Sequence, residues 1–239
     1  MASQNTMDRR SEWFVPKFGP QRFRIAVGLL FLPYTGMVLS FTIMGSMVAE
    51  KIYWDRVVSI LIIYFFALGI GAHALDAIGT NGIRPWGKIF SRKQLWFMAA
   101  ASLAVAYALG IYYMLNDAPL LWSIALLEGF FLLSYNLEWF GGRFHTDEWF
   151  VISWGVLPVL AGYVLQTNRF SLSSFMLAIG AGFLSYVEIT ASRPYKELKR
   201  AASSSQEIDD SLLRYERILK SISMGTIFTA LGMMIWRWN

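Results

Sequence analysis

The sequence predicts an all-α integral membrane protein, a bundle of about seven transmembrane helices. Hydrophobic residues make up 56% of the 239 residues and charged residues only 15%, whereas an ordinary soluble domain has about 25% charged residues. Long apolar runs recur along the chain, and most Lys and Arg residues lie in alternate connections between them. The net charge of +5 does not call for a nucleic-acid partner, because basic residues collect at the ends of membrane helices.

Seven segments are apolar enough to cross a hydrocarbon core of about 30 Å, which takes roughly 20 helical residues. They are residues 25–48, 57–77, 95–115, 120–138, 149–166, 171–190 and 219–236. Pro33 and Pro158 lie inside two of these segments, where we expect them to kink the helix. The chain is therefore expected to form a polar N-terminal arm, 1–24, and one membrane domain, 25–238.

The basic residues predict the orientation. If the N-terminus is cytoplasmic, 17 of the 21 Lys and Arg residues lie on the cytoplasmic side. The other side keeps only Lys51, Arg56, Arg169 and Arg237. This asymmetry is typical of the positive-inside rule. We therefore expect the N-terminus and the loops after the second, fourth and sixth spans to be cytoplasmic, and the C-terminus to lie outside.

The segment 193–218 is predicted to be a cytoplasmic loop that leads into the last span. It contains a serine run and an acidic patch, and its apolar residues recur at helical spacing from Leu212 to Leu219 among Arg214, Glu216 and Arg217. This pattern favours an amphipathic helix at the membrane interface. The chain has no cysteine, which excludes disulfides and thiolate metal sites.

Polar residues that can carry chemistry gather at the cytoplasmic ends of three spans. His73 and Asp76 end the second span at a spacing that places them on one helix face, and Asn81 and Arg84 follow. The fourth and sixth spans end in two further sets, which are Tyr135, Asn136, Glu138, Arg143, His145, Asp147 and Glu148, and then Glu188, Ser192, Arg193, Tyr195 and Lys196. Ionisable groups at membrane depth are costly and by default mark a functional cavity.

Simpler structural interpretations exist for these residues. His73 and Asp76 could satisfy each other where the helix leaves the bilayer. The residues from His145 to Glu148 could form a solvated loop, with Thr146 or Asp147 capping the next helix. The basic residues after the second span could serve topology alone.

Glu128 stands apart, because it lies in mid-span within the sequence IALLEGFF. A carboxyl group there must be neutral or partnered, so Glu128 is a further site candidate. Several tryptophans near the cytoplasmic end are typical of an interfacial belt and of packing, although aromatic walls also stabilise carbocations by cation–π attraction. They are Trp86, Trp139, Trp149 and Trp154.

The stretch HALDAIGTNGIRPWGKIFSRKQLW, residues 73–96, resembles the region after the second helix in the UbiA superfamily of intramembrane prenyltransferases. In that family an Asp-rich motif of the type N-D-x-x-D-x-x-x-D precedes an Arg-Pro signature. Asp76 matches the central Asp, and Arg84-Pro85 matches the Arg-Pro. LSYNLEWFGGRFHTDEWFVISWGVLPVLAGY is similar to the junction of the family's helices 4 and 5, and LSYVEITASRPYKELKR lies where the second Asp-rich motif falls. The resemblance covers roughly residues 20–235.

The sequence departs from the family at several motif positions. His73 and Thr80 stand where the first motif has Asp residues, and the second motif keeps Glu188 but has Arg193 and Lys196 in place of acids. The family usually has nine spans, whereas this sequence predicts seven. The resemblance therefore also implies that a membrane partner chain could supply the two remaining spans.

The resemblance implies an enzyme that transfers an isoprenoid chain from a polyprenyl diphosphate to a lipophilic acceptor. Asp76 and Glu188 would hold Mg²⁺, with His73 and Asp147 as weaker ligands, because a hard cation prefers carboxylate oxygens. The diphosphate would be bound directly by Arg84, Arg143, Arg193 and Lys196, with Asn81 beside them. The acceptor or the carbocation would be oriented by Tyr135, Asn136 or Glu138.

Two alternatives remain open at this point. A terpene cyclase on the same scaffold would let the carbocation attack an internal double bond of the same substrate. A non-catalytic relative would bind a lipid or quinone, or serve as a subunit of a membrane complex. Release of diphosphate separates the two enzymes from the non-catalytic protein, and a cyclic product formed without acceptor identifies the cyclase.

Overall fold

The computed structural model describes residues 12–79, 90–201 and 206–239. These residues are 84% helical and include no strand. The all-α class predicted from the sequence is therefore confirmed. The Asn81 and Arg84 expected to bind diphosphate lie outside the described residues.

The helices follow one another along the chain with short connections. The α-helices are α1 (Gln21–Leu29), α2 (Leu32–Met47), α3 (Trp54–Tyr64), α4 (His73–Gly79), α5 (Arg92–Asn116), α6 (Leu121–Asn136), α7 (Asp147–Val151), α8 (Leu157–Thr167), α9 (Leu172–Ala201) and α10 (Gln206–Trp238). Two π-helical segments and one 3₁₀ segment connect some of them: η2 (Phe65–Ala72), η4 (Ile152–Val156) and η3 (Trp139–Gly142).

The π-helical segments join shorter helices into membrane-length ones. Segments α3, η2 and α4 form one helix, Trp54–Gly79, and α7, η4 and α8 form another, Asp147–Thr167. Segment η4 ends two residues before Pro158. Proline has no N–H to donate to the preceding turn, and a wider turn is one way in which a helix accommodates such a loss.

Five helices are long and apolar enough to cross a membrane, namely Trp54–Gly79, Arg92–Asn116, Asp147–Thr167, Leu172–Lys199 and Asp210–Trp238. Helices α1 and α2 make a sixth span if the pair, bent by 43°, counts as one. Each of the seven predicted segments is helical, but α6 has only 16 residues, which is about 24 Å of helix. These long apolar helices indicate a membrane-embedded protein with five or six spans.

We expected a bend at Pro33, and the structure places it two residues earlier, at Phe31. Phe31, between α1 and α2, has a left-handed φ of 42°, and Pro33 occupies the first turn of α2. Proline suits that turn because its missing N–H has no helical partner there. The predicted first span is thus two helices.

The segment 193–218 differs from its expected form. Helix α9 continues to Ala201 and α10 already begins at Gln206. The helical spacing seen from Leu212 onward therefore belongs to α10, the helix that contains the last candidate span, and its place at the membrane interface stays a prediction. Pro194 lies within α9.

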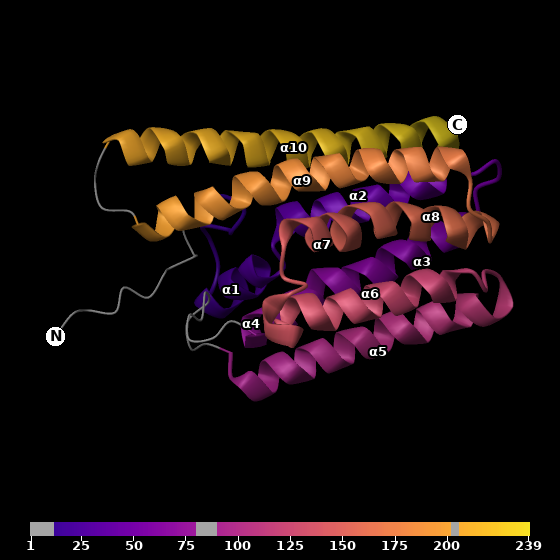
Figure 1. Ribbon diagram of the computed structural model, residues 1–239, viewed down its shortest axis with the longest axis horizontal. Coiled ribbons are helices and arrows are strands. Elements are labelled where there is room, and N and C mark those ends of the chain that lie inside the picture. The colour runs from indigo at the N-terminus through magenta and orange to yellow at the C-terminus, as the bar shows by residue number, and fades with distance from the viewer. Residues whose placement is uncertain (1–11, 80–89, 202–205) are drawn as a thin grey trace.

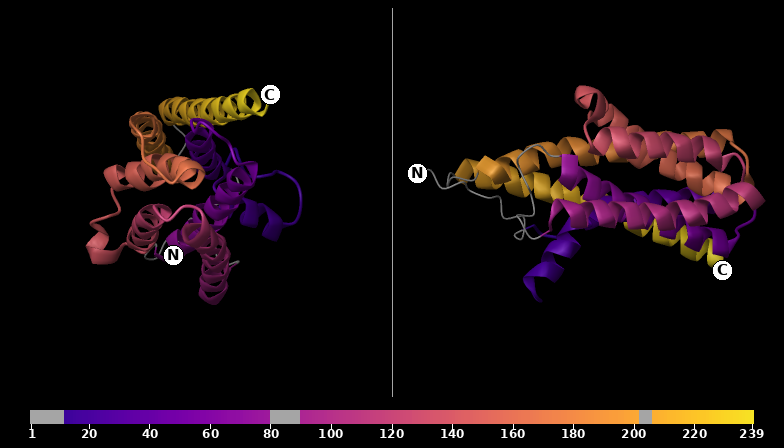
Figure 2. Two further views of the ribbon diagram at one scale, coloured as in Figure 1. Left: turned by 90° about the vertical axis from the view of Figure 1, so that its right-hand side faces the viewer. Right: turned by 90° about the horizontal axis from the view of Figure 1, so that it is seen from below.

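The helices run roughly along the long axis of the molecule. In Figure 1, α9 and α10 lie along one side, α5 and α6 along the other, and α2, α3 and α8 between them. The further views show the same bundle end-on and from below, with α1 projecting sideways from it (Figure 2). The C-terminus lies at one end of the bundle, and at the opposite end α4, α6 and α9 end and α5, α7 and α10 begin (Figure 1).

Helices α2 and α8 cross at backbone contact. A Cβ added to Gly45 of α2 would collide with the backbone of Val159, and a Cβ added to Gly162 of α8 would collide with the carbonyl of Thr42. The Ser46 hydroxyl donates to the Thr42 carbonyl at 2.9 Å and lies 3.2 Å from the Gly162 carbonyl. Small residues that let backbones meet are a common basis of helix association in membranes.

We expect Gly45→Ala and Gly162→Ala each to destabilise the protein by about 1–3 kcal/mol, because an added methyl group forces the two backbones apart. Thermal unfolding in detergent, followed by size-exclusion chromatography, measures the effect. Gly180→Ala in α9 and Gly225→Ala in α10 are matched controls, since no atom lies within 4 Å of the added methyl group. Equal melting temperatures for all four variants would contradict the close crossing.

The predicted orientation can be measured because the chain has no cysteine. We expect Glu197→Cys, at the end of the bundle that holds the ends of α4 and α6, to react with a membrane-impermeant maleimide only after the cytoplasmic face is opened. Glu50→Cys, in the exposed turn after α2, should react in intact cells or right-side-out vesicles. The reverse pattern would show that the positive-inside assignment is inverted.

Candidate functional site

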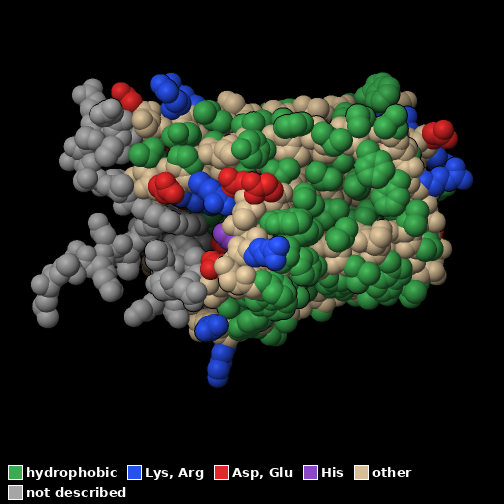
Figure 3. Space-filling view, viewed as in Figure 1, with side chains coloured by type: hydrophobic (Ala, Val, Ile, Leu, Met, Phe, Trp, Pro, Cys, Tyr) green, Lys and Arg blue, Asp and Glu red, His purple; other side chains and the backbone are tan. Residues whose placement is uncertain are grey.

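A polar cavity of about 260 Å³ lies at the end of the bundle where α2 begins and α4 and α6 end. Charged side chains gather toward this end in the space-filling view, around a histidine, while hydrophobic side chains cover most of the remaining face (Figure 3). Seven of the predicted site residues line it: His73, Asp76, Tyr135, Asn136, Glu138, Arg193 and Lys196. His145 and Trp154, which the sequence also placed near this end, belong to the same wall.

Five lining residues were missed from the sequence. They are Phe31, Tyr34, Phe150, Ile189 and Glu197. Four of them belong to apolar runs that give no local sign of facing a cavity, and their position follows from how the helices pack. Glu197 directly follows Lys196 in the motif LSYVEITASRPYKELKR, so this motif could have predicted it as a lining residue.

Aromatic rings form one wall of the cavity. The His73 ring lies between Phe31 and Trp154, with centroid distances of 5.0 and 5.3 Å. Trp154 stacks on Phe150 at 5.4 Å, and Tyr34 meets Phe150 edge-on at 5.9 Å. The wall is assembled from α2, α4, α7 and η4, which come from three separate parts of the chain.

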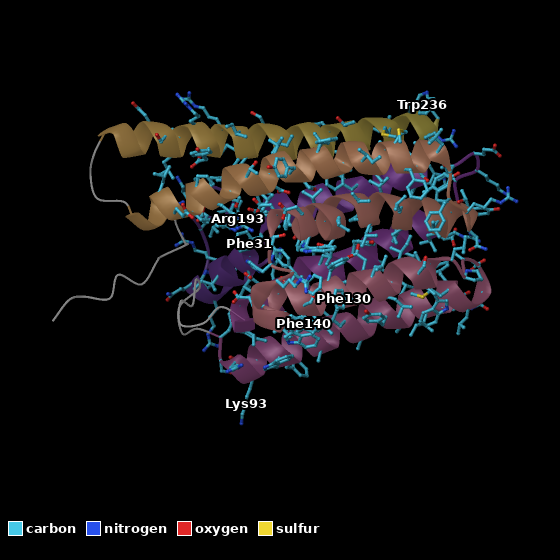
Figure 4. All side chains as sticks on the ribbon, in the orientation of Figure 1. Phe31, Lys93, Phe130, Phe140, Arg193 and Trp236 are labelled. Atoms are coloured by element: carbon cyan, nitrogen blue, oxygen red, sulfur yellow. The ribbon has the colours of Figure 1, made fainter. Side chains whose placement is uncertain are left out.

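Two cations of α9 face this wall. Arg193 and Lys196 are three residues apart, so they share one face of the helix, and Figure 4 shows Arg193 near Phe31. The Lys196 ammonium lies 5.1 Å from the centroid of Phe31 and 5.2 Å from that of Tyr34, within cation–π range. Tyr34 also donates its hydroxyl hydrogen to Ser192 on the same helix.

Asp147 holds the Arg193 guanidinium. The Asp147 Oδ1 atom lies 2.7 Å from Nε of Arg193, and the two side chains are 25% and 42% exposed. A guanidinium has five N–H donors, so this contact leaves donors for another anion. Asp147 is the first residue of α7, and Thr146 occupies the N-cap position as anticipated, although its hydroxyl donates to Glu148.

The connection from α6 to α7 closes the cavity from the end. The His145 ring stacks on Tyr135 with centroids 4.4 Å apart, and its Nδ1 lies 2.9 Å from the Tyr135 carbonyl. Glu138 has a left-handed φ of 52°, which turns the chain sharply at the end of α6. A methyl group on Gly79 would collide with the carbonyl of Asn136, so the end of α4 that carries Asp76 lies directly against the end of α6.

Four of the described candidate residues are not among those that line the cavity: Arg143, Asp147, Glu188 and Glu128. Asp147 is held to the wall through its contact with Arg193. Arg143 is exposed and is not among the lining residues. Glu188 is only 1% exposed and also does not line the cavity. Its Oε1 has no hydrogen-bond partner among the described residues. Glu128 lines a different cavity, in the middle of the bundle.

The described residues bring together no group of three His, Asp or Glu side chains that could hold a metal ion. Asp76 reaches the cavity without Glu188, its expected partner as a ligand. Magnesium therefore stays a prediction from the resemblance. The described wall itself offers two cations, Arg193 and Lys196, and three carboxylates, Asp76, Glu138 and Glu197.

Comparison with known proteins adds no assignment. No protein-family model, curated protein or solved structure matches this chain. The chemistry of the cavity therefore has to be argued from its own residues.

We expect His145→Ala to loosen the connection between α6 and α7, because the stacking on Tyr135 and the contact with its carbonyl are both lost. Trypsin should then cut after the exposed Arg143 several times faster than in the unchanged protein, as followed by mass spectrometry. Glu148→Gln is the control, since this exposed side chain keeps a hydrogen-bond acceptor for Thr146. An unchanged cleavage rate would show that His145 does not hold the connection.

Proposed function

We propose that this chain is a UbiA-like intramembrane enzyme that binds an isoprenoid diphosphate in the polar cavity and transfers the isoprenoid to a lipophilic acceptor. The observation that carries the proposal is the pairing of Arg193 and Lys196 with an aromatic wall at the polar end of an apolar bundle. A charged head and a hydrocarbon tail on one molecule suit such a position. The motif resemblance around Asp76 and in α9 points to the same substrate class.

The cations suit the diphosphate. Arg193 is oriented through Nε by Asp147, and its remaining N–H donors fit the bidentate geometry of phosphate oxygens. Lys196 adds a compact charge three residues further along α9. Binding the leaving group in this way stabilises the negative charge that develops as the carbon–oxygen bond breaks.

The aromatic wall suits the carbocation. Loss of diphosphate, which departs with the bonding electron pair, leaves an allylic cation. The faces of Phe31, Tyr34 and Trp154 attract a cation. Lys196 lies over Phe31 and Tyr34 in the structure and would turn to the diphosphate before the carbocation takes its place. A cation bound there would be shielded from water by apolar side chains.

The acceptor completes the reaction. An electron-rich carbon or oxygen of the acceptor attacks the cation, forms the new bond and then releases one proton. Asp76, Glu138 and Glu197 are the described carboxylates that line the cavity and could take it. The UbiA resemblance also implies Mg²⁺, which would neutralise the diphosphate further. Orientation of the diphosphate, shielding of the cation and removal of the proton fall to side chains of this chain.

A non-catalytic function has one observation in its favour. The described lining has three carboxylates for two cations, and no metal-binding group occurs among the described residues. Such a wall could bind a lipid head group without ionising it. Diphosphate release is the property that decides between this protein and an enzyme.

We expect Arg193→Ala and Lys196→Ala each to weaken the binding of a prenyl thiodiphosphate, a slowly reacting analogue, by about tenfold or more. Binding is measured by calorimetry in nanodiscs, and turnover by diphosphate release from prenyl diphosphates of different lengths with Mg²⁺. Arg143→Ala is the matched control, because this exposed arginine lies outside the cavity wall and should leave binding unchanged.

The outcomes separate the alternatives. Diphosphate release with a cyclic product in the absence of acceptor would identify a cyclase. Binding that survives in Asp76→Ala and Arg193→Ala, together with no diphosphate release from any prenyl diphosphate, would exclude both enzymatic functions at this cavity.

A further inference from the structure

A second cavity, of about 70 Å³, lies in the membrane-spanning part of the bundle between the Trp54–Gly79 helix, α5 and α6. Apolar side chains and glycines make up nearly all of its wall. Three residues supply polar groups: Tyr64, Tyr107 and Glu128. Cavities of this kind bind lipophilic molecules and orient them through a few polar atoms.

The Glu128 carboxyl group is only half used by the protein. Tyr64 donates its hydroxyl hydrogen to Oε1 at 2.9 Å. Oε2 is buried and has no hydrogen-bond partner among the described residues. Carboxyl groups in the hydrocarbon region are expensive, and buried polar atoms are nearly always hydrogen-bonded. An unpaired oxygen in a cavity wall is therefore a point at which a bound molecule can form a hydrogen bond.

Tyr107 lies beside this carboxyl group. A Cβ added to Gly129 would collide with the Tyr107 hydroxyl, so the glycine next to Glu128 is what allows this hydroxyl to lie against α6. Tyr107 is 39% exposed on an apolar helix, and its exposed surface would face lipid. The cavity is thus within reach of a molecule that moves laterally from the bilayer.

The cavity is separate from the polar one. No lining residue is common to both. Glu128 and Tyr135 lie seven residues apart on α6, which is about 10 Å along the helix. A molecule held at Glu128 would not place its polar group within bonding distance of the diphosphate position.

We propose that this cavity is a binding site for the hydroxyl end of a lipophilic alcohol or phenol. A hydroxyl group fits in either protonation state of Glu128, because it donates to a carboxylate and accepts from a carboxylic acid. The apolar wall excludes charged head groups. A single water needs about 10–15 Å³ on the same scale, so about 70 Å³ admits a hydroxyl with a small ring or a short chain segment.

The test uses a long-chain alcohol that carries a diazirine near its hydroxyl, and the matched alkane probe without the hydroxyl, on the full chain in nanodiscs. We expect light to attach the alcohol to residues 103–132 of α5 and α6, at least about tenfold more than the alkane. Unlabelled alcohol should compete. Glu128→Leu should reduce the labelling by about tenfold or more, and Glu128→Gln, which keeps a donor and an acceptor, by less than about threefold.

Two further variants keep the test decisive. Gly129→Ala removes no polar group but forces the Tyr107 hydroxyl away from its place beside α6. It should also reduce labelling, which keeps the proposal testable if Glu128→Leu does not fold. Arg193→Ala, in the polar cavity, should not change the labelling, so that failure of the alcohol site is distinct from failure of the proposed transferase function. Equal labelling by the alkane, or full labelling of folded Glu128→Leu, would overturn the proposal.

Discussion

The close crossing of α2 and α8 is the contact on which the site depends. In a bilayer, packing and hydrogen bonds hold helices together, because lipid tails are as apolar as the side chains. Gly45 and Gly162 let the two backbones touch, and Ser46 bonds across the contact. The N-terminal turns of α2 and of the Asp147–Thr167 helix then lie side by side, which brings Tyr34 against Phe150 and Trp154. The aromatic wall of the polar cavity is thus a consequence of a crossing that lies several turns away from it.

The ionisable groups of the bundle differ in exposure and in hydrogen bonding according to their depth in it. At the polar end, Arg193 pairs with Asp147 and remains 42% exposed, so its charge is partly solvated. Deeper in the bundle the carboxyl groups of Glu128 and Glu188 each keep one oxygen without a hydrogen bond among the described residues. Glu128 differs in that it lines a cavity. That difference, and not burial alone, is why Glu128 carries a ligand-binding proposal and Glu188 does not.

The sequence predicted helices well and orientations of side chains only partly. Apolar length alone locates membrane helices, because every backbone group in lipid must be paired internally, and all seven predicted segments are helical. The break at Phe31 and the extension of α9 to Ala201 were not predicted, since polar residues such as Lys196 continue a helix that has left the apolar pattern. The motif resemblance identified Asp76 and Arg193, which line the cavity, but it could not exclude Arg143 or Glu188. Whether a side chain reaches a cavity depends on how the helices are rotated against one another, and a single sequence does not contain that rotation.

Under the proposed function, the ordering of side chains before substrate binds is what would make the polar cavity suitable for ionising a substrate. A flexible cation gains little from binding a leaving group, because its side chain must first be ordered. Arg193 is ordered beforehand by Asp147, and Lys196 by the rings of Phe31 and Tyr34. The same contacts limit the affinity for the intact substrate, since Asp147 competes for the guanidinium. In the proposed reaction, the negative charge on the diphosphate would grow as the carbon–oxygen bond breaks and would compete more strongly with Asp147. Contacts that strengthen along the reaction in this way favour the transition state over bound substrate, which is the requirement for catalysis.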